Sequence, residues 1–222
     1  MTIEATPTGR SMVFGHLPIS YDERVLEPRP WTVAQSRWAA EWMGHEPARV
    51  LELCAGAGHI GLLALTLAGA PDVAHRLVTV DVNPVACDLT ARNATAAGLD
   101  HLLEVRNGLI EDVLTQDDRF DVVIADPPWV NRSDTGRFPD DPLVAIDGGH
   151  DGLDIAWHCL RAADAHLVPG GSVVLQLGSP EQVSRVADHL PDVASGLSLV
   201  EVRPFGPQGV LVLLTREPAA HV

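Results

Sequence analysis

Seven short apolar runs, each bounded by turn residues, follow the first forty residues of the chain. Their length and nearly continuous apolar character are typical of strands that are buried on both faces. The runs cover residues 50–53, 77–80, 102–105, 122–125, 172–177, 197–202 and 210–214, and helical patterns cover residues 60–68, 84–97, 153–167 and 181–190. Strands that alternate with helices predict an α/β fold, in which a mostly parallel sheet carries helices on both faces.

The two ends of the chain depart from this alternation. No helical pattern separates the last two runs, which are joined only by the turn residues 204–209. We therefore expect an antiparallel pair of strands at the edge of the sheet. The first ten and the last six residues follow no pattern and are predicted to be loose ends.

The fourth run ends in the sequence Asp126-Pro127-Pro128-Trp129. A buried strand thus delivers Asp126 to its carboxyl end, and two prolines stop any continuing ladder or helix. A carboxylate, free carbonyl groups and an indole face are thereby presented side by side. Hydrogen-bond acceptors beside a stacking face suit a planar group that carries N–H bonds. Taken alone, the same four residues also fit a strand-ending turn anchored by a tryptophan.

A glycine-rich loop follows the first run, where Gly56, Gly58 and Gly61 match the pattern G-x-G-x-x-G. The next strand ends in Asp81, where a carboxylate can meet ribose hydroxyl groups. A nicotinamide dinucleotide and S-adenosylmethionine both fit these features, as does a close-packed strand–helix turn with Asp81 as a helix cap. Glu52 precedes the loop and favours S-adenosylmethionine, because a carboxylate there would repel a pyrophosphate.

Composition narrows the classes of partner. The chain has 222 residues, with 15 basic and 30 acidic side chains and a formal net charge of −15. It is therefore a poor match for nucleic acid, because proteins bind nucleic acid largely through basic residues that contact the phosphates. Three cysteines without a CxxC pair favour a reducing compartment over a disulfide framework or a zinc site. We expect a cytoplasmic protein without a signal peptide, membrane span or metal, and assign Asp147, Asp151 and Asp154 to glycine-rich turns.

These motifs together resemble class I S-adenosylmethionine-dependent methyltransferases, and more narrowly the peptide chain release factor glutamine methyltransferases. The resemblance rests on residues 22–30, 52–58, Asp81, 126–129 and 146–154. It implies a Rossmann-like sheet of seven strands and S-adenosyl-L-methionine as cofactor. Three departures are visible: Asp126 and Trp129 stand where that family has Asn and Tyr, Asn107-Gly108 stands where it has an acid near the adenine, and its N-terminal helical domain has no counterpart.

The resemblance also implies the roles of individual residues. The expected catalytic residues are Asp126, Pro127 and Trp129, and the expected substrate pocket contains Arg29, Trp31 and Trp129. The expected cofactor contacts are Glu52, Cys54, Ala55, Gly56, Gly58, Asp81, Val82, Asn107, Gly108 and Asp126. Residues 1–45 are expected to form an N-terminal extension and a helix that cover the active site, and residues 46–222 the catalytic domain.

The departure at Asp126 bears on the methyl acceptor. An asparagine amide donates and accepts hydrogen bonds and so complements a carboxamide, whereas an ionised aspartate only accepts. The sequence therefore favours N-methylation of a small, arginine-like metabolite that carries a guanidine or an amine. A glutamine in a protein or peptide is the first alternative. An amino group in nucleic acid, a methyltransferase-like subunit without catalysis and a dinucleotide-dependent oxidoreductase are the others, and the oligomeric state stays open.

Overall fold

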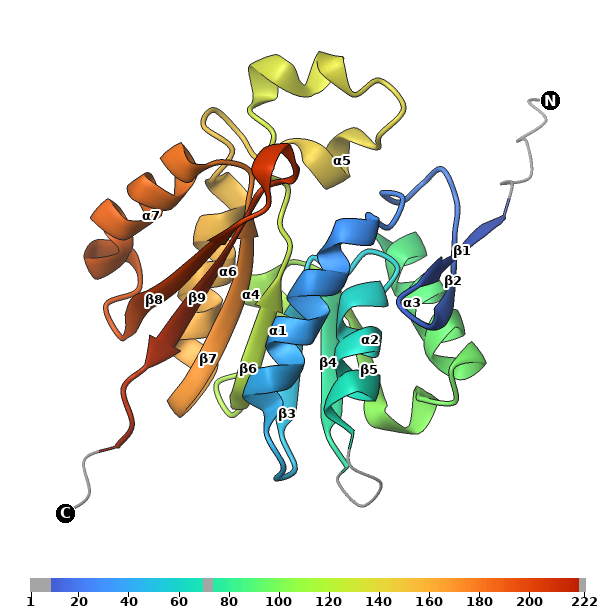
Figure 1. Cartoon of the computed structure of the whole chain (residues 1–222), viewed down its shortest axis with the longest axis horizontal. Coiled ribbons are helices and arrows are strands. Elements are labelled where there is room, and N and C mark those ends of the chain that lie inside the picture. The colour runs from blue at the N-terminus through green and yellow to red at the C-terminus, as the bar shows by residue number, and fades with distance from the viewer. Residues whose placement is uncertain (1–8, 70–73, 220–222) are drawn as a thin grey trace.

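A seven-stranded sheet forms the centre of the molecule in the computed structural model, which describes residues 9–69 and 74–219. Its strands are β3 (Arg49–Leu53), β4 (Arg76–Asp81), β5 (Leu103–Asn107), β6 (Phe120–Ala125), β7 (Leu167–Leu177), β8 (Leu197–Pro204) and β9 (Val210–Arg216). They lie in the order β5-β4-β3-β6-β7-β9-β8 (Figure 1). The first five are parallel, and β9 runs antiparallel to β7 and β8. The predicted sheet and its antiparallel edge pair are confirmed.

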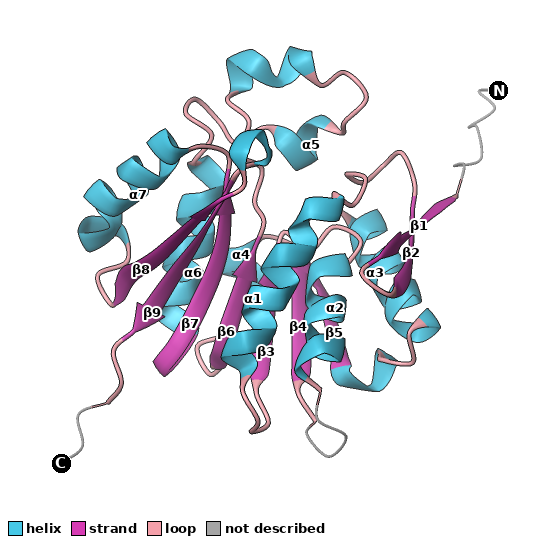
Figure 2. Cartoon of the chain, in the orientation of Figure 1, coloured by secondary structure: helices cyan, strands magenta, loops and turns pink. Residues whose placement is uncertain are grey.

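Helices cover both faces of this sheet, as predicted (Figure 2). The longer helices are α1 (Val33–Met43), α2 (His59–Ala68), α3 (Pro84–Ala96), α6 (Asp154–His166) and α7 (Pro180–Val193). Short helical turns are α4 (Ile110–Val113), α5 (Leu143–Ile146) and the 3-10 segments Pro30–Thr32, Asp100–Leu102, Arg132–Arg137 and Gly206–Gln208. None of the described helices is long and apolar enough to cross a membrane.

Alternate residues of the central strands build two separate cores. Val50, Val122 and Ile124 pack in one core with α1, α2 and α3. Their neighbours Leu51 and Val123 pack in the other core with α6 and α7. Successive side chains of a strand point to opposite faces, so a strand covered on both sides must be apolar throughout, which explains the continuous apolar runs.

A β-hairpin precedes the first helix and was not predicted. Its strands are β1 (Arg10–Phe14) and β2 (Leu17–Tyr21), joined through Gly15 with φ 62°. The prediction of a loose end was wrong for Arg10, while residues 1–8 and 220–222 lie outside the described residues. Phe14 and Ile19 of the hairpin are buried in the core that contains α1 and α2. The predicted division at residue 45 therefore separates two parts that share one core.

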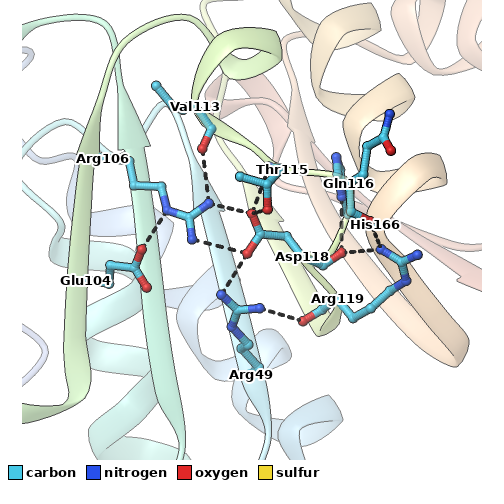
Figure 3. A network of polar contacts seen from close by, with 9 residues as sticks. All are labelled: Arg49, Glu104, Arg106, Val113, Thr115, Gln116, Asp118, Arg119 and His166. Carbon is cyan, nitrogen blue, oxygen red and sulfur yellow. Dashed lines mark hydrogen bonds and ion pairs between the residues drawn. The ribbon is translucent and has the colours of Figure 1, made fainter.

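A charged network ties the turn before β6 to two other strands (Figure 3). Asp118 accepts hydrogen bonds from Arg106 of β5 at 2.6 and 3.1 Å and from Arg49 of β3 at 2.8 Å. Its carboxylate is 5% exposed, and hydrogen bonding to Arg106 is the main cause that lowers its pKa below the ordinary value. The network joins the amino-terminal end of β3 and the turn before β6 to Arg106, which lies near the carboxyl end of β5.

Candidate active site

A cavity of about 470 Å³ opens at the carboxyl ends of β3, β4 and β6. It brings together eight of the residues expected at the site: Arg29, Cys54, Ala55, Gly56, Asp81, Val82, Gly108 and Asp126. The expected residues Trp31, Glu52, Gly58, Asn107, Pro127 and Trp129 do not line it. Another hollow, of about 540 Å³, lies between the hairpin and α3 and is lined by none of the expected residues. The cavity at the strand ends is therefore the candidate active site.

The glycine loop presents bare backbone to this cavity. Cys54, Gly56 and Gly58 all have positive φ, at 58°, 56° and 72°. A side chain added at Gly56 would meet no atom within 4 Å, whereas one at Gly58 would lie 2.6 Å from Thr90 of α3. Gly56 thus leaves room for a ligand to approach the chain, and Gly58 allows the loop to pack on α3.

Asp81 holds the glycine loop from the end of β4. Its carboxylate accepts hydrogen bonds from the backbone amides of Gly56 at 2.8 Å and Asn83 at 2.9 Å. Burial is the main cause that raises its pKa above the ordinary value. Asp81 also lines the cavity, so it is placed to meet a ligand, and its contact with ribose stays a prediction.

Glu52 lies beneath the loop instead of in the cavity wall. Its side chain is 2% exposed, and one oxygen accepts a hydrogen bond from the Gly61 amide at 3.1 Å. The other oxygen has no partner within the described part of the chain, and a Cβ on Gly61 would lie 2.4 Å from it. Burial raises the pKa of Glu52 to about 8, so the carboxyl group is mostly protonated at neutral pH. The third glycine of the pattern makes room for this buried acid.

Asp126 follows β6 and lines the cavity. Burial raises the pKa of its carboxyl group to about 7, so both the protonated and the ionised form are populated near neutral pH. The carbonyl of the preceding Ala125 accepts a hydrogen bond at 2.9 Å from Gln35 of α1, which also donates to Val174 of β7 at 3.1 Å. Gln35 thereby fixes the strand end from which Asp126 projects.

The turn after Asp126 is held by a glutamine from α7. The side chain of Gln182 donates to the carbonyls of Trp129 at 2.9 Å and Asp151 at 3.0 Å, and accepts from the Gly178 amide at 2.7 Å. The Trp129 ring packs on Gly178, where an added Cβ would lie 2.3 Å from it. Trp129 is thus an anchor of the turn, and its stacking on a substrate stays a prediction.

The segment 146–154 supports the same turn from the other side. The Gly148 amide donates to the carbonyl of Val130 at 2.9 Å, and a Cβ at Gly148 would lie 2.6 Å from the Pro128 carbonyl. A Cβ at Gly152 would lie 2.3 Å from the carbonyl of Trp129. Glycine is required here because two backbone segments touch.

No group of three potential metal ligands occurs among the described residues.

Arg29 connects two segments that border the cavity. One of its guanidinium nitrogens contacts both carboxylate oxygens of Asp141, at 2.8 and 2.7 Å, and its guanidinium lies 5.9 Å from the centre of the Trp31 ring. Asp141 precedes α5, which stands above the carboxyl ends of the strands in Figure 1. The indole nitrogen of Trp31 is buried and has no partner among the described residues. The substrate contacts of Arg29 and Trp31 stay predictions.

Sequence reasoning missed four residues of this region: Gln35, Glu111, His158 and Gln182. Each has at least one partner far away along the chain, such as the 47 residues that separate Glu111 from His158. Asn107, expected near an adenine, donates its side-chain amide to the carbonyls of Asp81 at 2.9 Å and Val82 at 3.1 Å. No local sequence pattern distinguishes the four missed residues, which all lie on helices, from the residues of an ordinary solvated helix face.

Comparisons with known proteins identify the family of this chain. A family model described as "Methyltransferase small domain" matches residues 36–139. The ribosomal protein uL3 glutamine methyltransferase of Bordetella pertussis is 31% identical over 217 residues, which cover 95% of this chain and 69% of that protein. The release factor glutamine methyltransferase of Cereibacter sphaeroides is 34% identical over 185 residues, which cover 81% of this chain and 62% of that protein.

Solved structures show the same fold at lower identity. A ribosomal protein L11 methylase from Lactobacillus delbrueckii subsp. bulgaricus has a TM-score of 0.63 and 16% identity, and the match covers 87% of this chain and 82% of that one. The catalytic domain of hMettl16, solved with an RNA hairpin, has a TM-score of 0.71 and 14% identity, with 93% and 77% covered. The overall fold is thus shared with these two proteins.

Proposed function

Since the chain belongs to the class I S-adenosylmethionine-dependent methyltransferases related to the uL3 and release factor glutamine methyltransferases, we propose that its methyl acceptor is the side-chain amide of a glutamine in a protein. The chain covers 69% of the Bordetella relative and 62% of the Cereibacter relative. The relatives alone therefore do not define the acceptor, and the residues of this site have to support it.

The glycine loop and the end of β4 fit the cofactor. When bound, S-adenosylmethionine supplies an electrophilic methyl carbon on a sulfonium that leaves as a neutral thioether. Gly56 offers open space beside its backbone, and Asp81 presents a partly buried carboxylate to the same cavity. These two residues are the ones that would hold the nucleoside and amino-acid parts of the ligand.

The observation that best supports a glutamine acceptor is the pKa of Asp126, which burial raises to about 7. A protonated carboxyl group has one O–H donor and one carbonyl acceptor, which is the same pairing capacity as the asparagine amide at this position in the release factor family. It complements a carboxamide, which also offers one donor and one acceptor on its edge. The aspartate is therefore compatible with a glutamine substrate when it carries its proton.

Orientation of the acceptor nitrogen is the main task of the turn. The lone pair of an amide nitrogen is delocalised, so the site must fix that nitrogen and accept hydrogen bonds from its N–H groups. The nitrogen gains the methyl group and releases one proton to water. The Pro127 carbonyl accepts no hydrogen bond from the described residues, but Pro127 does not line the cavity, so its contact with the acceptor nitrogen stays a prediction. Gln35, Gln182 and the glycines at 148 and 152 keep the turn rigid.

A guanidine-bearing metabolite is the second candidate, and the carboxyl group of Asp126 is the observation that favours it. An ionised aspartate would pair with a guanidinium by charge-assisted hydrogen bonds. The sequence alone favoured this substrate, whereas the relatives support the glutamine alternative better.

Two peptides that differ at one position separate the candidates. The purified protein is incubated with S-adenosylmethionine and peptides that carry either glutamine or arginine at their centre, with free arginine as a third substrate. Mass spectrometry then locates the added methyl group. We expect a methyl group on the glutamine side chain and none on arginine. Methylation of arginine or a free guanidine, with no product on glutamine, would overturn the proposal.

A further inference from the structure

One wall of the cavity lies away from Asp126, at the end of β5. In the sheet, β5 is separated from β6 by β4 and β3, which is roughly 14 Å at the usual spacing of strands. This wall is built by Val82, Gly108, Leu109, Ile110, Glu111, Ile155 and His158. Most of these side chains are apolar, and Glu111 and His158 are the ionisable ones. The wall suits a flat, largely apolar ligand group with one polar edge.

The residue expected to read that edge does not face the cavity. Asn107 uses its side-chain amide on the backbone carbonyls of Asp81 and Val82, and Gly108 has no side chain. Neither of the two positions where the family has its acid, Asn107 and Gly108, therefore provides a carboxylate. Glu111, at the second residue of α4, is the acid that lines this part of the cavity.

Glu111 is held in place by a residue from another helix. The Nδ1 atom of His158, on α6, contacts one carboxylate oxygen of Glu111. The two side chains are 53% and 42% exposed, so the other carboxylate oxygen can reach a ligand. A hydrogen bond from its own backbone amide, and then the contact with His158, lower the pKa of Glu111 below its ordinary value. Glu111 is therefore an ionised, acceptor-only group at neutral pH.

We propose that Glu111, positioned by His158, accepts a hydrogen bond from the exocyclic amino group of the cofactor's adenine and so selects adenosine over inosine. An adenine presents a 6-amino donor where hypoxanthine presents a 6-oxo acceptor. A carboxylate oxygen accepts a hydrogen bond from the 6-amino group. It repels the 6-oxo group, because both oxygens present lone pairs. Val82, Ile110 and Ile155 supply apolar contacts to the base. Glu111 thus takes the place of the acid that this chain lacks at positions 107–108.

Binding measurements test this assignment without any methyl acceptor. Titration calorimetry compares S-adenosylhomocysteine with S-inosylhomocysteine on the wild type and on Glu111→Gln. A hydrogen bond to a charged, half-exposed acceptor corresponds to a preference of about 10-fold or more for the adenosine ligand. The substituted amide offers both a donor and an acceptor, so we expect that preference to fall to about threefold or less. Asp112→Asn is the matched control, because Asp112 is the exposed neighbour of Glu111 and does not line the cavity. It should keep the wild-type preference.

The role of His158 needs its own readout. His158→Ala should reduce the adenosine preference, and His158→Asn should restore part of it, because an asparagine amide can still donate to Glu111. Thermal unfolding of each variant shows whether the fold is kept, and Glu111→Ala provides a second removal of the carboxylate. The proposal is overturned if Glu111→Gln and Glu111→Ala both retain the wild-type preference, or if the wild type binds both ligands equally.

Discussion

Replacing Glu52 with glutamine should stabilise the protein increasingly as the pH rises. Glu52 is 2% exposed, one of its oxygens lacks a partner among the described residues, and burial raises its pKa from 4.5 to about 8. The folded state therefore keeps a proton that the unfolded state releases above pH 4.5. Stability contributed by this group is fully present below pH 4.5 and is lost as the pH rises towards 8.

The size of the effect follows from the two pKa values. Between them, the free energy of unfolding falls by about 1.4 kcal/mol for each pH unit, so roughly 3 kcal/mol is lost between pH 4.5 and pH 7. Glutamine has nearly the same shape and does not titrate. Glu52→Gln should therefore gain stability over the wild type by roughly 2–3 kcal/mol as the pH rises from 5 to 7.

Urea unfolding followed by circular dichroism at pH 5, 6 and 7 measures this difference directly. Glu46→Gln is a suitable control, because Glu46 is exposed and its removal should leave the pH dependence unchanged. A stability difference between Glu52→Gln and the wild type that stays constant from pH 5 to pH 7 would refute the reasoning about the buried acid.

Three further changes test other parts of the account. Asp81→Ala should weaken S-adenosylmethionine binding by about 1–3 kcal/mol in calorimetry, because a charged hydrogen-bond partner is lost. Unchanged affinity would contradict the assignment of Asp81 to the cofactor site. Gln182→Leu leaves the carbonyl of Trp129 unpaired, so turnover should fall more than cofactor affinity; equal losses would argue against a role in the turn. Asp118→Asn should destabilise by about 2 kcal/mol at pH 7 and by progressively less as the pH falls below 4, because the unfolded wild-type chain then takes up a proton that the folded, ion-paired carboxylate resists; a pH-independent loss would contradict the ion-pair explanation.

The sheet could be predicted from the sequence because its strands are buried on both faces. Such strands must be apolar along their whole length, as in Val122–Val123–Ile124, and this signal does not depend on distant residues. The hairpin β1–β2 gave a weaker signal, because only alternate residues of β2 are buried. Its position depends on Asn93 of α3, whose side chain contacts the Ser20 backbone.

The site was predicted only where a motif lies on one continuous segment. The glycine loop, Asp81 and Asp126 each end a strand, and parallel strands bring their ends together. Glu52, by contrast, was expected to contact the cofactor, and it lies under Gly61 instead of lining the cavity. Contacts between helices, such as that of Glu111 with His158, depend on how α4 and α6 pack and leave no local pattern.

The pH dependence of methyl transfer to a glutamine peptide tests the central claim most directly. If protonated Asp126 pairs with the carboxamide, kcat/KM of the wild type should fall about tenfold per pH unit above about pH 7, because the ionised carboxylate cannot donate. The positive sulfonium of a bound cofactor would move the midpoint lower without changing the direction. Asp126→Asn cannot ionise, so its profile should be flat and should exceed the wild type at high pH. A wild-type profile that is flat or rises with pH, parallel to that of Asp126→Asn, would contradict the account.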